Sequence, residues 1–331
     1  MEIKRPPAVR AEVSGRKAAG IGLALGGGGA RGLAHIGVLR VLEDQGIPVG
    51  NIAGTSMGAL VGGCYAAKGC VEPIERLALS LDWKYLARLF APGFSISGIV
   101  NDERIRRFIA EFTGDSMIEG LGIPFAAVAA DMETGAESVF SSGPLVNAIM
   151  ASISIPAVFR PVREGDRILA DGGLANPLPV SIARRLGPYP VVAVNVQQAS
   201  GEFGKSGSIN VKPGFDSLLA SLKERFAPHQ AISRAARKTT GGDDGTVRAA
   251  RRSPTRKTGT PNLVQIFIQS VDLIEANLQT ALLDQWPPDV LLSPDVDEIR
   301  LFDFHAAEKA IEAGKKAAMD AMPEIRRLAN P

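Results

Sequence analysis

Short apolar segments alternate with longer amphipathic ones along the first 200 residues. Residues 21–25 and 190–196 are almost wholly apolar, which is typical of buried parallel strands. Residues 30–45 and 57–68 have helical spacing, and each ends at a glycine. Strands that alternate with helices predict a mostly parallel central sheet with helices on both faces, a three-layer α/β/α fold.

The composition changes at about residue 198. Residues 19–331 are expected to form a single domain, preceded by a flexible, basic lead-in at 1–18 and interrupted by an insertion at about 198–261 that is rich in Gly, Ser, Thr, Lys and Arg. Between 223 and 257 ten Lys and Arg face three acidic residues. A lid, a membrane arm and a solvated loop remain open as interpretations of this insertion. It lacks the interleaved aromatic residues typical of nucleic-acid binding.

No secretory leader or membrane-spanning run is recognised, so a cytoplasmic location is expected, with peripheral contact at the inner membrane surface as an option. The two cysteines, Cys64 and Cys70, are interpreted as buried free thiols. Two Cys and three His give no zinc spacing, and no calcium loop is found. Neither a metal nor a cofactor is therefore expected.

Two glycine-rich turns carry the chemistry. The first is Gly26-Gly27-Gly28-Gly29-Ala30-Arg31-Gly32, and the second is Gly54-Thr55-Ser56-Met57-Gly58. Each follows a predicted strand and opens a predicted helix. The first offers unblocked N–H groups at a helix N-terminus, and the second presents a serine hydroxyl on a tight turn.

The glycines also match a dinucleotide fingerprint, Gly27-x-Gly29-x-x-Gly32. That fingerprint requires a carboxylate near the end of the second strand, but residues 52–55 contain none. No Lys-Ser or Lys-Thr pair follows the glycines, so a Walker-type phosphate loop is absent too. Nucleotide binding is the disfavoured alternative.

A serine nucleophile needs a base. Asp171 ends the predicted strand at 167–170 and precedes Gly172 and Gly173. Because the carboxyl ends of parallel strands meet at one sheet edge, Ser56 and Asp171 are expected to converge there. Taken singly, Ser56 also suits a flexible turn and Asp171 a turn-capping carboxylate. The histidines are disfavoured as the base; they are His35, His229 and His305.

The order of these motifs resembles the patatin-like phospholipase family, and bacterial relatives of the neuropathy target esterase catalytic domain in particular. The stretches at 130–135 (Ala-Asp-Met-Glu-Thr-Gly) and 151–159 agree with it, and the resemblance covers about residues 21–196. It implies a Ser–Asp dyad without histidine. Ser56 would be the nucleophile and Asp171 the general base.

The resemblance also implies the surroundings of the dyad. The N–H groups of Gly27, Gly28 and Gly29 would form the oxyanion hole, with Arg31 and Gly32 completing the loop. Gly54 and Gly58 would shape the nucleophile elbow, and Gly172 and Gly173 the turn that supports the base. For Asp171 to act near neutral pH its pKa must be raised, so apolar neighbours such as Leu169 are expected.

The activity implied is hydrolysis of fatty-acyl esters of phospholipids or lysophospholipids. A catalytically silent, lipid-binding relative remains the main alternative. Candidates for an acyl groove, which suit ordinary core packing equally well, are Leu86, Leu89, Phe90, Phe94 and Ile96. Chain length, head group and oligomeric state are left open by the sequence.

Overall fold

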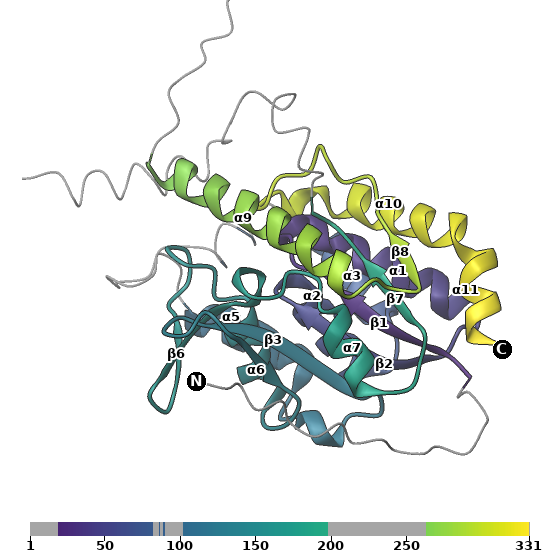
Figure 1. Ribbon diagram of the computed structural model, residues 1–331, viewed down its shortest axis with the longest axis horizontal. Helices are drawn as coiled ribbons and strands as arrows, with labels where there is room; N and C mark the ends of the chain where they lie inside the picture. The colour runs from purple at the N-terminus through teal and green to yellow at the C-terminus, as the bar shows by residue number, and fades with distance from the viewer. Residues whose placement is uncertain (1–18, 82–85, 87–88, 90–101, 198–262, 331) are drawn as a thin grey trace, which may run out of the picture.

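The computed structural model describes residues 19–81, 86, 89, 102–197 and 263–330 (Figure 1). The predicted lead-in at 1–18 and the predicted insertion at 198–261 lie outside these residues, so the division of the chain remains a prediction. Three of the groove candidates lie outside them as well: Phe90, Phe94 and Ile96.

The described residues build one mixed sheet of eight strands in the order β5-β6-β3-β2-β1-β7-β8, with β4 paired to β3. The run from β3 to β8 is parallel, whereas β4 and β6 are antiparallel to β3 and β5 to β6. The strands are β1 (Ile21–Leu25), β2 (Val49–Thr55), β3 (Phe125–Asp131), β4 (Glu137–Phe140), β5 (Val162–Glu164), β6 (Arg167–Asp171), β7 (Val191–Val194) and β8 (Val290–Leu292). The predicted α/β/α architecture is confirmed, while the short strand β5 was not predicted.

Alternate side chains of the central strands enter two different cores. Leu23 and Leu25 of β1 pack with the helices of one face, and Ala24 packs with those of the other. The α-helices are α1 (Ala34–Asp44), α2 (Met57–Lys68), α3 (Glu72–Ser80), α5 (Asp102–Thr113), α6 (Leu145–Ser152), α7 (Val180–Leu186), α9 (Leu263–Gln285), α10 (Ala307–Asp320) and α11 (Met322–Ala329). The first core includes α1, α2, α5 and α10, and the second includes α7 with the end of α9 (Figure 1).

The C-terminal helical segment is divided into α10 and α11 at Ala321. One local expectation, that both cysteines are buried, was wrong. Cys64 is buried, but Cys70 lies just beyond the C-terminal end of α2 and is exposed. Cys70 follows Gly69, which ends α2 in a left-handed conformation, so Cys70 lies beyond the buried face of the helix.

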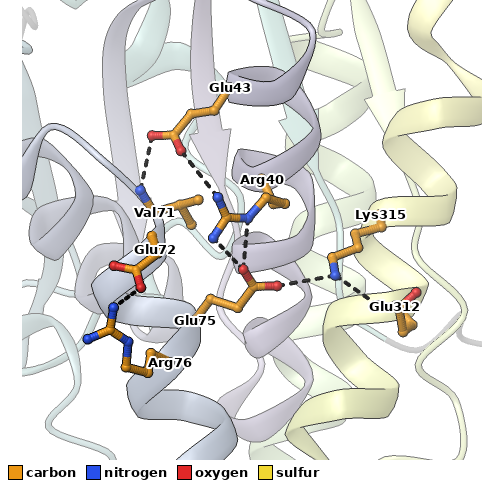
Figure 2. A network of polar contacts seen from close by, with 8 residues as sticks. All are labelled: Arg40, Glu43, Val71, Glu72, Glu75, Arg76, Glu312 and Lys315. Atoms are coloured by element: carbon orange, nitrogen blue, oxygen red, sulfur yellow. Dashed lines mark hydrogen bonds and ion pairs between the residues drawn. The ribbon is translucent and has the colours of Figure 1, made fainter.

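A network of ion pairs joins α1, α3 and α10 on the surface (Figure 2). Glu75 of α3 accepts hydrogen bonds from Arg40 Nε at 2.7 Å and Nη2 at 2.5 Å, and its other oxygen lies 3.2 Å from Lys315 Nζ of α10. These contacts connect three helices that lie far apart in the sequence.

Candidate active site

Ser56 and Asp171 meet at a junction between two strands. Ala127 of β3 pairs with β2 on one side and β4 on the other, whereas Ala129 pairs with β4 and with Asp171 of β6. Strands β2 and β6 therefore occupy the same side of β3, one after the other, and run toward each other. Their carboxyl ends meet there.

This arrangement corrects the expected route of convergence. We expected Asp171 to reach the site on a strand parallel to β2, but β6 is antiparallel to β3. A hairpin formed by β5 and β6 begins beyond the end of β2 and returns toward it. Local sequence gives no strand direction, so this reversal was missed.

Ser56 lies on a strained turn between β2 and α2. Its φ of 52° and ψ of −119° are unusual for a residue with a side chain. A Cβ at position 58 would lie 2.1 Å from Leu25 O, and one at position 54 would lie 2.5 Å from Gly58 O. Only glycine fits at these two positions, as expected for a nucleophile elbow.

Ser152, which was missed from sequence, stabilises this turn. Its Oγ accepts a hydrogen bond from the Ser56 N–H at 2.8 Å and donates one to Val128 O at 2.6 Å. Ser152 is fully buried at the end of α6, so α6 and β3 both hold the elbow in place. Position 152 falls within the quoted stretch at 151–159, which was the available signal.

The Ser56 hydroxyl donates a hydrogen bond to Asp171 Oδ2 at 2.6 Å. The other oxygen, Oδ1, accepts one from the Gly173 N–H at 2.8 Å. Burial raises the pKa of Asp171 to about 6, although the hydrogen bonds from Ser56 and Gly173 act in the opposite direction. The carboxylate is thus a stronger base than an exposed aspartate, while remaining largely ionised at neutral pH.

A small recess lies beside the dyad, and the glycine loop forms one of its walls. The recess is lined by Ser56, Asp171, Gly28 and Gly29. The Gly27 N–H, by contrast, already donates to Pro177 O at 2.9 Å. Of the three glycines expected to supply oxyanion donors, Gly28 and Gly29 are the two that line the recess.

Arg31 is buried behind the loop. Its Nε donates to Gly28 O at 3.1 Å, and its Nη2 lies 3.2 Å from Asp272 Oδ1 of α9. His35 supports the loop from α1, with Nε2 at 2.8 Å from Gly26 O. Burial lowers the pKa of His35 to about 4, so its ring is neutral at physiological pH.

Helix α9 brings a second carboxyl into the recess. Glu275 is buried against the turn after Asp171, where a Cβ at position 173 would lie 2.3 Å from Glu275 Oε1. Its Oε2 accepts a hydrogen bond from Gln197 Nε2 at 2.8 Å. Burial, followed by the charges of Asp171 and Asp272, raises the pKa of Glu275 to about 8 against the opposing effect of Arg31. Glu275 therefore carries a proton at neutral pH.

A large apolar cavity opens beside the nucleophile. It encloses about 1040 Å³, including its opening, and Ser56, Gly29, Ile155 and Leu301 belong to both the cavity and the recess. Its walls come from α2, α3, α5 and the segment before α10. Representative lining residues are Met57, Leu60, Ile74, Phe108, Phe112 and Phe304.

Some of the residues predicted from sequence line this cavity and others do not. Leu86 and Leu89 line it, as expected for an acyl groove. His305 is exposed at the start of the C-terminal helices, and His229 lies outside the described residues. Asp272 and Glu275 of α9, and Gln197 just after β7, were not identified from sequence, because they lie outside the motifs on which the site prediction was based.

The chain is similar to known proteins over most of its length. A model of the patatin-like phospholipase family matches residues 23–184. An uncharacterised NTE family protein of Mycobacterium tuberculosis is 32% identical over 96% of this chain and 94% of its own length. The chain therefore belongs to the patatin-like phospholipase family.

Two further relatives match over about half of this chain. Lysophospholipase NTE1 of Saccharomyces cerevisiae is 36% identical over 54% of this chain and 11% of its own length. A patatin-like phospholipase domain-containing protein of Caenorhabditis elegans is 36% identical over 53% of this chain and 13% of its own length. The family and these relatives support a lipid acyl hydrolase in general terms. Within the described ranges, no helix combines the length and apolarity needed to cross a bilayer.

Proposed function

We propose that the chain is a serine acyl hydrolase that cleaves fatty-acyl esters of phospholipids or lysophospholipids through a dyad of Ser56 and Asp171. The observation that carries the proposal is the 2.6 Å hydrogen bond from the Ser56 hydroxyl to a buried carboxylate, at a strained elbow beside an apolar cavity. A serine hydroxyl becomes an effective nucleophile when a positioned base accepts its proton.

In the first half of the cycle, Ser56 Oγ bonds to the ester carbonyl carbon as its proton passes to Asp171 Oδ2. The N–H groups of Gly28 and Gly29 are the proposed donors to the tetrahedral oxyanion. One such donor is typically worth about 10²–10³ in rate. The carbonyl then re-forms, the ester C–O bond breaks, and the alcohol leaves with the proton from Asp171.

In the second half, water attacks the acyl-Ser56 ester and gives a proton to Asp171. Collapse of the second tetrahedral intermediate breaks the bond to Ser56 Oγ, which takes the proton back, and the fatty acid is released. The cavity offers an apolar site for the acyl chain next to the reacting carbonyl.

A fluorophosphonate probe tests the nucleophile, because it bonds covalently to an activated serine. We expect the purified chain to be labelled, Ser56→Ala to be unlabelled, and Ser154→Ala to be labelled like the parent. Ser154 is a suitable control because its buried hydroxyl donates to Met150 O, and its only hydrogen bond with Asp171 is made by the backbone carbonyl, which the substitution keeps. Absence of labelling in the parent chain would contradict the hydrolase proposal and favour a silent lipid-binding protein.

We also infer peripheral contact with a lipid surface. Four apolar side chains of α9 are exposed and support this inference: Ile266, Phe267, Leu273 and Ile274. Of these, Phe267 also lines the recess at Ser56. The sequence preceding α9 is strongly basic between 223 and 257, which suits anionic headgroups.

Deleting 239–257 should weaken sedimentation with anionic vesicles and leave hydrolysis of a short soluble ester intact. Unchanged sedimentation would contradict this role.

A further inference from the structure

Helix α9 contacts the glycine loop through one ion pair. Asp272 lies 241 positions after Arg31, outside the region that the family model matches, yet the two side chains are 3.2 Å apart. The Arg31 side chain is 3% exposed and that of Asp272 is 21% exposed. A guanidinium so deeply buried requires a compensating carboxylate.

Arg31 in turn fixes one peptide of the loop. Gly28 O accepts two hydrogen bonds from this residue, one from Nε at 3.1 Å and one from the backbone N–H at 3.2 Å. The C=O and the following N–H point in opposite directions across a trans peptide. Holding Gly28 O against Arg31 therefore turns the Gly29 N–H away from Arg31, and Gly29 lines the recess at Ser56.

The Gly28 peptide needs this restraint. Gly28 has a φ of 149°, a value that glycine tolerates and other residues avoid. Such a backbone has many alternative conformations, and an oxyanion donor is effective only when it is oriented before the reaction. The orientation thus depends on Arg31, and the place of Arg31 depends on its carboxylate partner.

We propose that Asp272 is a positioning residue for the oxyanion loop: it holds Arg31, which holds Gly28 O, which orients the Gly29 N–H toward the Ser56 recess. This inference rests on the proposed hydrolase function. Without Asp272, the buried guanidinium would lose the carboxylate that holds it beside Gly28.

Asp272→Asn tests the proposal, with Asp284→Asn as the matched control. Asp284 is an exposed residue of the same helix, so the control makes the same charge change away from the recess. The readouts are kcat and KM for a p-nitrophenyl ester, and inhibition by an alkyl trifluoromethyl ketone. The ketone forms a tetrahedral adduct with serine whose oxyanion occupies the oxyanion hole.

We expect Asp272→Asn to lower kcat by roughly 10–100-fold, somewhat less than removal of a whole donor. KM should change by less than about twofold, because the oxyanion forms only in the transition state. Affinity for the trifluoromethyl ketone should fall by the same factor as kcat/KM. A merely structural role would lower the amount of active enzyme but leave ketone affinity unchanged.

The proposal is overturned if Asp272→Asn matches the control in kcat and ketone affinity, or if only KM changes. Should Asp272→Asn fail to fold, Arg31→Met/Asp272→Asn removes both charges, leaves neither unpaired, and should show the same losses. Fluorophosphonate labelling separates the two levels of inference. An unlabelled parent chain refutes the hydrolase proposal, whereas a labelled parent with a control-like Asp272→Asn refutes only the role of Asp272.

Discussion

The surface network around Glu75 and the recess at Ser56 both contain partly or fully buried carboxylates, but the pKa values of these carboxylates shift in opposite directions. On the surface, burial tends to raise the pKa of Glu75, but hydrogen bonds from Arg40 and Lys315 outweigh it and the pKa is lowered (Figure 2). In the recess, burial prevails and the pKa values of Asp171 and Glu275 are raised. The difference lies in the supply of cations, which are abundant around Glu75 and limited in the recess.

The comparison shows that the environment of a carboxylate decides whether it stabilises the fold or serves as a base. A carboxylate with cationic partners favours the folded state, because its charged form is better stabilised there than in the unfolded chain. A desolvated carboxylate opposes folding but is a better base. We therefore expect substitutions in the recess to reduce activity more than stability, and substitutions in the surface network to do the reverse.

The largest effect is expected for Asp171→Asn. The amide keeps the shape of the carboxyl group but cannot accept the Ser56 proton. General-base catalysis contributes about 10²–10⁴ in rate, so kcat should fall by about that factor. Because the substitution also removes a buried charge, the melting temperature at pH 7 should stay the same or rise. Near-normal turnover, measured with a soluble ester, would exclude Asp171 as the base.

The next largest effect is expected in the pH dependence of kcat/KM. Protonation removes the base form of Asp171, whose pKa burial raises to about 6. We expect kcat/KM to be constant near pH 7 and to fall about tenfold per pH unit well below pH 6. A pH profile in buffers of constant ionic strength measures this. An acid limb centred near pH 4 would instead indicate a base that is exposed to solvent.

Sequence allowed the central prediction because the dyad residues lie in short motifs with a local structural cause. Gly54 and Gly58 allow the tight turn at Ser56, and an aspartate before two glycines favours a capped turn at Asp171. Such features depend on neighbours within a few positions. The alternation of strands and helices followed from periodicity in the same way.

Other parts of the site depend on contacts across long stretches of chain. Asp272 and Glu275 occupy one face of a helix whose sequence shows only an amphipathic pattern, and their partners precede them by more than 70 positions. The antiparallel direction of β6 likewise results from the hairpin that it forms with β5. No local pattern encodes these relations, so they became visible only in three dimensions.

A smaller effect, on stability, is expected for Glu275→Gln. The pKa of Glu275 is raised in the folded state, so the folded chain binds this proton more tightly than the unfolded chain does. Its contribution to stability therefore declines as the pH rises from its unfolded pKa toward about 8. Glutamine retains an acceptor for Gln197 and has no charge to desolvate. We expect Glu275→Gln to raise the melting temperature by an increment that grows between pH 5 and pH 8. An increment independent of pH would contradict the raised pKa of Glu275 in the folded chain.

The smallest effect is expected in the surface network. Glu75→Gln removes a charge that two cations share, whereas the control Glu72→Gln affects only an exposed pair with Arg76. Partly exposed ion pairs are worth at most about 1 kcal/mol each, so Glu75→Gln should lower the melting temperature by a few degrees and Glu72→Gln by less. The difference should shrink at high salt, because exposed charges are screened. Both variants should keep the esterase activity of the parent; a loss of activity in Glu75→Gln comparable to that in Asp171→Asn would mean that the packing of α1, α3 and α10 controls the recess, and that the two regions are not independent.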